Sequence, residues 1–194
     1  MRLRMFVWLA LVGLVGLVGM MGVFFVGIGN ASAQDEVYTG KMVRKKGLST
    51  ESVQLDLRIR ERATQEQADA LLKILNEDGS DALMEELRKG DYGEARVTGG
   101  RMRRIVWVRV FPGQNGSSVL IVTDRPIYFP SDKLDEQPAP TTALGVIQLE
   151  MNDRGQGRGR LAEAVAMHVT DEGVLQIQSA RPTTIEVEDV KREQ

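Results

Sequence analysis

The sequence predicts an α+β domain that is mostly antiparallel β, with a two-helix hairpin inserted after the second strand. Three observations lead to this fold class. Residues 52–60 alternate between apolar and polar side chains, residues 64–90 carry apolar side chains at helical spacing, and from residue 103 onward short apolar runs alternate with turn-forming residues. Strands at that regular spacing favour a meander that closes toward a barrel or packs as a sandwich.

The first two strands are expected over residues 36–43 and 52–60. In the second, Val53, Leu55, Leu57 and Ile59 fall on one face and polar residues on the other, which is the pattern of a half-buried strand. The basic run 44–47 is interpreted as the turn that joins the two strands.

The helical segment is marked by its caps. Thr64 and Gln67 have the spacing of a capping box, and the apolar residues that follow form one helical stripe. Gly79 is placed to end a first helix and Gly90 to end a second. The sequence therefore predicts a helical hairpin over about 64–90 that covers part of the sheet.

The remaining strands are expected over residues 105–111, 118–123, 144–151, 160–169, 174–179 and 184–190. The first two of these are apolar on both faces, which places them at the centre of the sheet or under the helices. Residues 131–142 are expected to form a loop. Residues 155–159, Gly-Gln-Gly-Arg-Gly, precede a strand rather than a helix, so they indicate a glycine-rich turn and not a phosphate loop.

The N-terminal 33 residues have the three parts of a secretory signal. Arg2 and Arg4 form a basic head, residues 5–28 are uncharged and apolar, and Ala31 and Ala33 offer the small side chains that a signal peptidase requires. We therefore predict a signal peptide over 1–33 and a single exported domain over 34–194. An uncleaved membrane anchor is the alternative, because the apolar stretch reaches the length of a membrane span. Both alternatives place the domain outside the cytoplasm, either in the periplasm or secreted.

Composition limits the chemistry of the exported part. The signal holds two of the 25 basic residues and none of the 27 acidic ones, which leaves residues 34–194 with a net charge of −4. This mild acidity predicts no nucleic-acid partner, and it leaves membrane contact to the N-terminal segment if that segment is not cleaved. The chain has no cysteine, so it has no disulfide, thiolate metal site or cysteine nucleophile. No metal and no cofactor are expected.

Four residues are the candidates for a binding site. His168 is the only histidine; a general base among alanines is one interpretation, and an ordinary surface residue is the favoured one. Trp107 lies in sequence among Arg101, Arg103, Arg104 and Arg109, a pattern compatible with nucleic-acid or polysaccharide binding, although charged strand rims explain it better. Asp124 and Arg125 follow a very apolar strand, and we expect Arg125 to be largely buried and structural. No catalytic residue is singled out.

Several segments resemble a group of uncharacterised exported bacterial proteins. These are residues 79–83, Gly99-Gly100, residues 122–127 with their Thr-Asp-Arg-Pro core, and residues 145–149. The resemblance implies export and a shared fold but carries no activity. The expected function is a non-enzymatic binding or interaction domain of the bacterial envelope, for a small apolar ligand in the barrel or for an envelope protein. The alternative is an envelope hydrolase that pairs Asp124 or Glu150 with another carboxylate.

Overall fold

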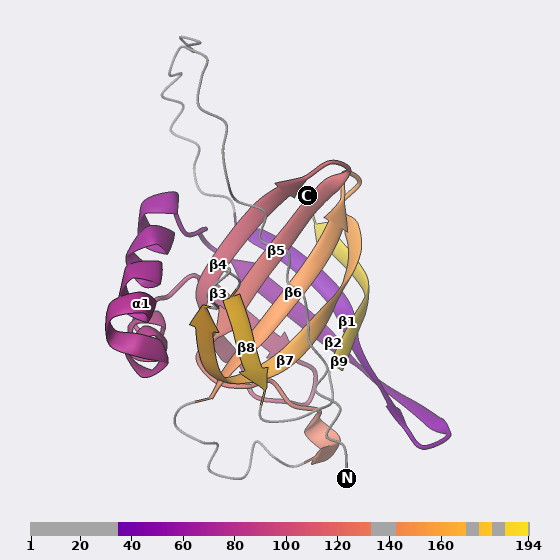
Figure 1. Cartoon of the computed structure of the whole chain (residues 1–194). Helices are drawn as coiled ribbons and strands as arrows, with labels where there is room; N and C mark the ends of the chain where they lie inside the picture. The colour runs from indigo at the N-terminus through magenta and orange to yellow at the C-terminus, as the bar shows by residue number, and fades with distance from the viewer. Residues whose placement is uncertain (1–34, 133–142, 170–174, 180–184, 194) are drawn as a thin grey trace, which may run out of the picture.

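A computed structural model describes residues 35–132, 143–169, 175–179 and 185–193 of the chain. Within them are nine strands, of which eight form a β-barrel, and a long helix that covers part of it (Figure 1). The elements in chain order are β1 Glu36–Lys46, β2 Ser49–Ile59, α1 Gln65–Leu87, β3 Gly93–Val97, β4 Arg103–Gly113, β5 Gly116–Thr123, the 3₁₀ helix η1 Pro130–Asp132, β6 Leu144–Asn152, β7 Gln156–Val169, β8 Leu175–Ser179 and β9 Ile185–Glu193.

Eight of the strands close into an antiparallel barrel. β1 to β7 pair in sequence order, β7 then pairs with β9, and β9 returns to pair with β1. β8 pairs with the last residues of β7, outside this ring. Because β9 closes back on β1, the sheet is a barrel and not a sandwich, and the prediction of a mostly antiparallel β domain is confirmed.

Two apolar cores stabilise the domain. The first fills the barrel with buried side chains from its strands and from the loop after β5, among them Tyr38, Leu55, Ile105, Ile121, Phe129 and Ile147. The second lies outside the barrel, where Leu75, Leu83, Met84 and Leu87 of α1 cover Val106, Val122, Leu144 and Val146 of β4, β5 and β6. The expectation that strands apolar on both faces lie under a helix is thus correct.

The helical cover is a single kinked helix, and the predicted two-helix hairpin is not confirmed. The capping box at Thr64 and Gln67 is present, and Gly79 interrupts the helix with a left-handed φ of 85°. Arginines from β4 hold both ends of α1. Arg109 donates to the Thr64 carbonyl and Arg104 to the Arg88 carbonyl, at 2.9 and 2.8 Å.

The spacing of those two arginines agrees with the kink. A straight helix of 23 residues would be about 35 Å long. Arg104 and Arg109, five residues apart on one strand, are separated by only about 17 Å. A change of direction at Gly79 brings the two helix ends closer to this spacing. Gly79 permits the change because glycine adopts positive φ without a steric penalty.

Three predicted boundaries are wrong. β3 was not predicted, because its five residues are shorter than the periodic runs around them. The basic run 44–46 belongs to β1, and the turn lies at Gly47 and Leu48, since Lys46 pairs with Ser49. β7 begins at Gln156, so only Gly155 of the glycine-rich segment turns, with a φ of 72°. Gly157 and Gly159 lie within the strand, where a Cβ would approach β6 carbonyl oxygens to 2.2 and 2.3 Å.

The predicted signal peptide, its cleavage site and most of the loop over 131–142 lie outside the described residues. In the part of the chain that the structure describes, no helix has both the length and the hydropathy that a membrane crossing requires.

Candidate functional site: a braced hairpin at one end of the barrel

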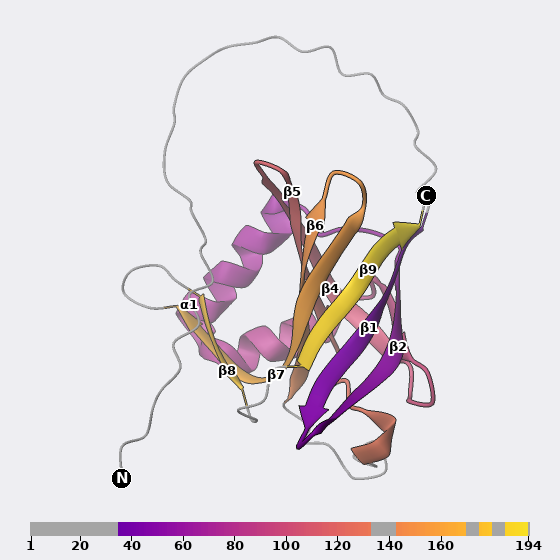
Figure 2. The ribbon, with the colours of Figure 1, turned by 90° about the vertical axis from the view of Figure 1, so that its right-hand side faces the viewer.

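One end of the barrel is closed by the chain that follows β5. Pro126, Ile127 and Phe129 are buried, and the last two belong to the interior core. η1 follows directly and lies beside the β1–β2 hairpin, as Figures 1 and 2 both show. This segment, residues 126–132, is called the strap below. The strap is held across the barrel end because its apolar residues enter the core.

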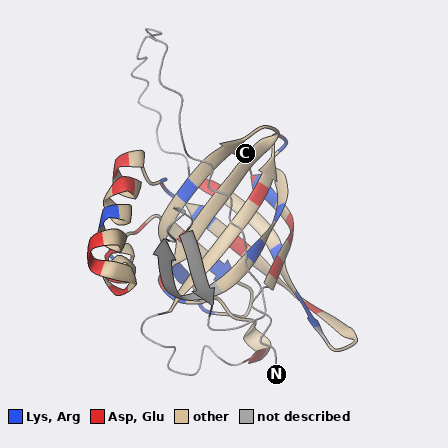
Figure 3. Cartoon of the chain, in the orientation of Figure 1, with Lys and Arg blue, Asp and Glu red and all other residues tan. Residues whose placement is uncertain are grey.

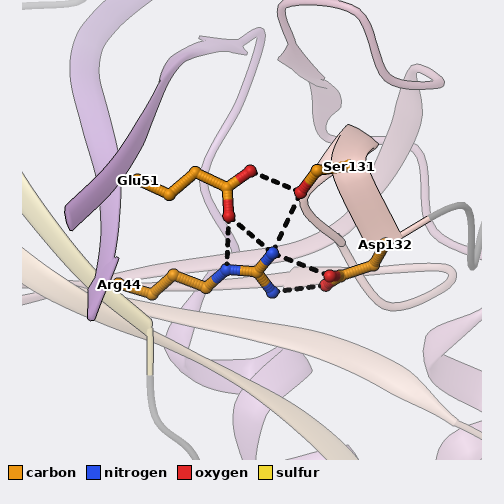
Figure 4. Close-up of polar contacts among 4 residues, drawn as sticks. All are labelled: Arg44, Glu51, Ser131 and Asp132. Carbon is orange, nitrogen blue, oxygen red and sulfur yellow. Dashed lines mark hydrogen bonds and ion pairs between the residues drawn. The ribbon is translucent and has the colours of Figure 1, made fainter. Parts of the chain in front are cut away.

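Arg44 of β1 ties the strap to the hairpin (Figure 4). Its Nη1 and Nη2 atoms bind the two Asp132 carboxylate oxygens at 2.5 and 2.7 Å. Its Nε and Nη2 atoms bind Glu51 Oε2 on β2 at 2.8 and 2.6 Å. Ser131 completes the network, since it accepts from Arg44 at 2.9 Å and donates to Glu51. The guanidinium also lies 4.2 Å from the centre of the Phe129 ring. These four polar residues are called the brace.

The three ionisable side chains of the brace are largely shielded from water. The side chains of Arg44, Glu51 and Asp132 are 22, 29 and 22 % exposed. The hydrogen bond from Asp132 raises the pKa of Arg44 above its ordinary value; burial opposes this shift and Glu51 adds to it. Planar, bidentate arginine–carboxylate pairs are among the most directional contacts in proteins. The brace therefore fixes the angle at which the hairpin leaves the barrel.

Beyond the brace, the hairpin projects as a two-stranded finger. β9 pairs with β1 from Val37 to Val43, and β3 pairs with β2 from Leu55 to Ile59, whereas β1 and β2 pair with each other as far as Lys46 and Ser49. The projecting end is visible in Figure 1. We call residues 45–50 the tip.

The tip carries the most exposed large apolar side chain among the described residues. Leu48 is fully exposed at the turn, and Lys45, Ser49 and Thr50 beside it are exposed as well. Gly47 has a φ of 64° at the first turn position, where a tight hairpin favours glycine. An apolar residue is thus held in water at the outermost point of a fixed hairpin.

The opposite end of the barrel contains a second polar cluster. The buried Tyr38 donates from its hydroxyl to Glu36 at 2.9 Å, and Arg62 binds the same carboxylate at 2.7 Å. Burial would raise the pKa of Glu36, but hydrogen bonds from Arg62 and Tyr38 outweigh it and leave that pKa lowered. Burial, reinforced by Glu36, raises the pKa of Tyr38. This cluster satisfies a buried hydroxyl at the barrel end and keeps it protonated.

Arg125 is exposed, so the prediction that it is largely buried is wrong. The buried guanidinium at this strand end belongs to Arg103, whose Nε donates to the Pro126 carbonyl at 3.0 Å. Asp124 is half-buried and makes two hydrogen bonds with the backbone of Arg104. Its carboxylate accepts from the Arg104 N–H at 3.2 Å, and its own N–H donates to the Arg104 carbonyl. The strand end is tied to the strap as expected, but by Arg103 and the backbone.

Trp107 has a packing role in the described part of the chain. Trp107 is half-buried between the two cores and packs edge-on against Tyr92, with ring centres 5.6 Å apart. The backbone of His168 pairs with Gln176 in β8, and its side chain lies outside the described residues. The arginines near Trp107 do not form one patch, because Arg103 is buried while Arg104 and Arg109 hold the helix ends.

The two carboxylates named for the hydrolase alternative, Asp124 and Glu150, lie far from each other. Asp124 follows Thr123, which pairs with Gly145, and Glu150 lies five residues further along β6. That separation is about 17 Å along the strand, whereas glycosidase pairs lie about 5–9.5 Å apart, so Asp124 and Glu150 do not pair with each other. Glu150 accepts instead from Ser118 and Gln148 on the outer barrel face. The described residues include no group of three or more His, Cys, Asp or Glu side chains placed to hold a metal ion.

The brace and the tip were not among the candidate residues from the sequence. The run Arg-Lys-Lys-Gly-Leu was visible, but its partner Asp132 lies 88 residues away from Arg44. Only the folded path of the strap across the barrel end brings the two together. Comparison with known proteins adds no assignment, because no protein-family model, no curated protein and no solved structure matches this chain.

Proposed function

We propose that this chain is a non-enzymatic binding domain of the bacterial envelope, and that its contact surface is the hairpin tip rather than the barrel interior. The observation that carries the proposal is the contrast between the packed barrel interior and the exposed hairpin tip. The interior is filled by buried apolar side chains, and Leu48 is held fully exposed by a braced hairpin.

An eight-stranded barrel either fills its interior with side chains or holds one small ligand there. Aromatic and aliphatic residues from every strand of this barrel meet in one core, and the strap adds Ile127 and Phe129 at one end. This packing supports an outward-facing contact over the interior apolar ligand expected from the sequence. The separation of Asp124 and Glu150 excludes only a pairing of these two carboxylates with each other.

A photoreactive amino acid in place of Leu48, in cells that produce the full chain, tests the proposal. We expect an adduct at position 48 and none when the same group replaces Asn115, an exposed turn residue at the other end of the barrel. Absence of an adduct at position 48 would contradict the proposal. A ligand in the barrel interior would also contradict the proposal. It would be seen in native mass spectrometry as an apolar molecule bound to the exported protein and lost from the Phe129→Ala variant, in which the strap is loosened.

A further inference from the structure

We infer that the tip binds the surface of an anionic lipid bilayer, with Leu48 entering the boundary between headgroups and acyl chains. This inference rests on the proposed function and names the partner of the same surface. It extends the expectation of membrane contact through the N-terminal segment to a second, separate site.

The apolar component of the contact is Leu48 itself. It occupies the turn, so it is the first side chain to meet a flat surface that approaches along the hairpin. Its neighbours Ser49 and Thr50 are small, uncharged and exposed. The nearest carboxylate, Glu51, is turned back to Arg44 and Ser131 in the brace. No acidic side chain of the tip therefore opposes entry.

The charge of the hairpin favours an anionic surface. Arg44 is paired with Glu51 and Asp132 in the brace, so the basic charge of the tip comes from Lys45 and Lys46, of which Lys45 is exposed beside the turn. Seven carboxylates and one lysine belong to α1, which lies across the barrel from the hairpin (Figure 3). An anionic membrane attracts the basic tip and repels the acidic helix, so the field of the domain orients the tip toward the lipid.

The size of the tip favours lipid over a protein pocket. A stable protein interface buries about 800 Å² on each side, and this projection offers a single large apolar side chain. A bilayer accepts one inserted residue together with basic side chains at the phosphate level.

The resulting contact is weak and reversible. Removal of each lysine is expected to lower the partition coefficient about fivefold. Removal of the buried leucine surface is expected to lower it by about 10- to 100-fold. Salt weakens the lysine part, because the Debye length falls to about 3 Å at 1 M.

The absence of cysteine allows a direct experiment on the full chain. A Thr50→Cys variant carries an environment-sensitive fluorophore on the tip, and Asn115→Cys carries it at the opposite barrel end. The labelled proteins are added to vesicles made of phosphatidylglycerol and phosphatidylcholine in equal parts, or of phosphatidylcholine alone. We expect a blue-shifted, brighter signal only from the tip label and only with the anionic vesicles.

Two further variants in the Thr50→Cys background test the named residues. Leu48→Asp abolishes the response, and Lys45→Gln lowers it about fivefold. Leu72→Asp, which adds the same charge at an exposed position of α1, leaves the response intact.

Three results would each overturn the lipid inference. They are equal responses from both labels, equal responses to both kinds of vesicle, and a response that survives Leu48→Asp. A silent tip label together with a protein adduct at position 48 overturns the lipid inference and leaves the proposed function standing. A silent label without any adduct overturns both.

Discussion

Replacing Arg44 by methionine is expected to lower the free energy of unfolding by about 2–4 kcal/mol. An exposed ion pair contributes about 0–1 kcal/mol, and breaking a fully buried one costs about 3–5 kcal/mol. The three charged side chains of the brace are 22–29 % exposed, which places this site between those limits. Loss of the cation–π contact with Phe129 adds about 0.5–1 kcal/mol. Methionine retains an apolar stem, so the change removes charge and hydrogen bonds more than packing.

Urea unfolding followed by tryptophan fluorescence measures this loss, with Trp107 as the probe between the two cores. Arg58→Met is the matched control. Arg58 binds Asp35 at 2.6 Å but is 64 % exposed, so its loss should cost less than about 1 kcal/mol. Adding Asp132→Asn to Arg44→Met should restore part of the stability, because one uncompensated carboxylate is then neutral. Equal losses for Arg44→Met and Arg58→Met would refute the brace as a structural element.

Three further predictions concern other contacts. Arg103→Met should lower the free energy of unfolding by about 2–3 kcal/mol, because it leaves the Pro126 carbonyl without its buried donor, whereas Arg125→Met should change it by less than about 0.5 kcal/mol in the same urea assay. Gly79→Ala should cost about 1–2 kcal/mol, seen as a lower melting temperature, because alanine is strained at a φ of 85°. Because folding raises the pKa of Tyr38, the phenol of the unfolded chain ionises first as the pH rises. The free energy of unfolding should therefore fall above about pH 10. Tyr38→Phe should make this fall shallower, as measured by urea midpoints across the same pH range.

The sequence predicted the elements whose patterns are long and periodic. The alternation over 52–60, the capping box at Thr64 and the two-sided apolar strands after residue 103 all correspond to observed elements. Barrel closure could not be predicted in the same way, because it depends on the pairing of β9 with β1, which lie at the two ends of the described chain. The kink of α1 was marked by Gly79, but the contacts that α1 makes on either side of it come from strands later in the chain.

The candidate site was harder to predict because burial of a charged residue is a tertiary property. Arg103 and Arg125 flank the same strand pair, and nothing in their local sequence shows which one the strap covers. The strap resolves this, since Pro126 places its carbonyl over Arg103 and leaves Arg125 in water. The basic run 44–46 resembles a turn by composition, yet the continuous register of β1 and β2 makes it strand.

The geometry of β1 links the two expectations about the N-terminus to the lipid inference. β1 begins at Glu36, three residues after the predicted cleavage site at Ala33, and Lys46 at its far end lies about 33 Å along the strand. If the N-terminal segment remains as an anchor, it joins the domain at the start of β1, the end opposite the tip, and the tip is then available to a second membrane. The anchored form should then aggregate anionic vesicles through Leu48, whereas the cleaved form should bind them without aggregation. Light scattering of vesicles mixed with the exported protein separates the two, and Leu48→Asp must abolish the aggregation if the tip is the second contact.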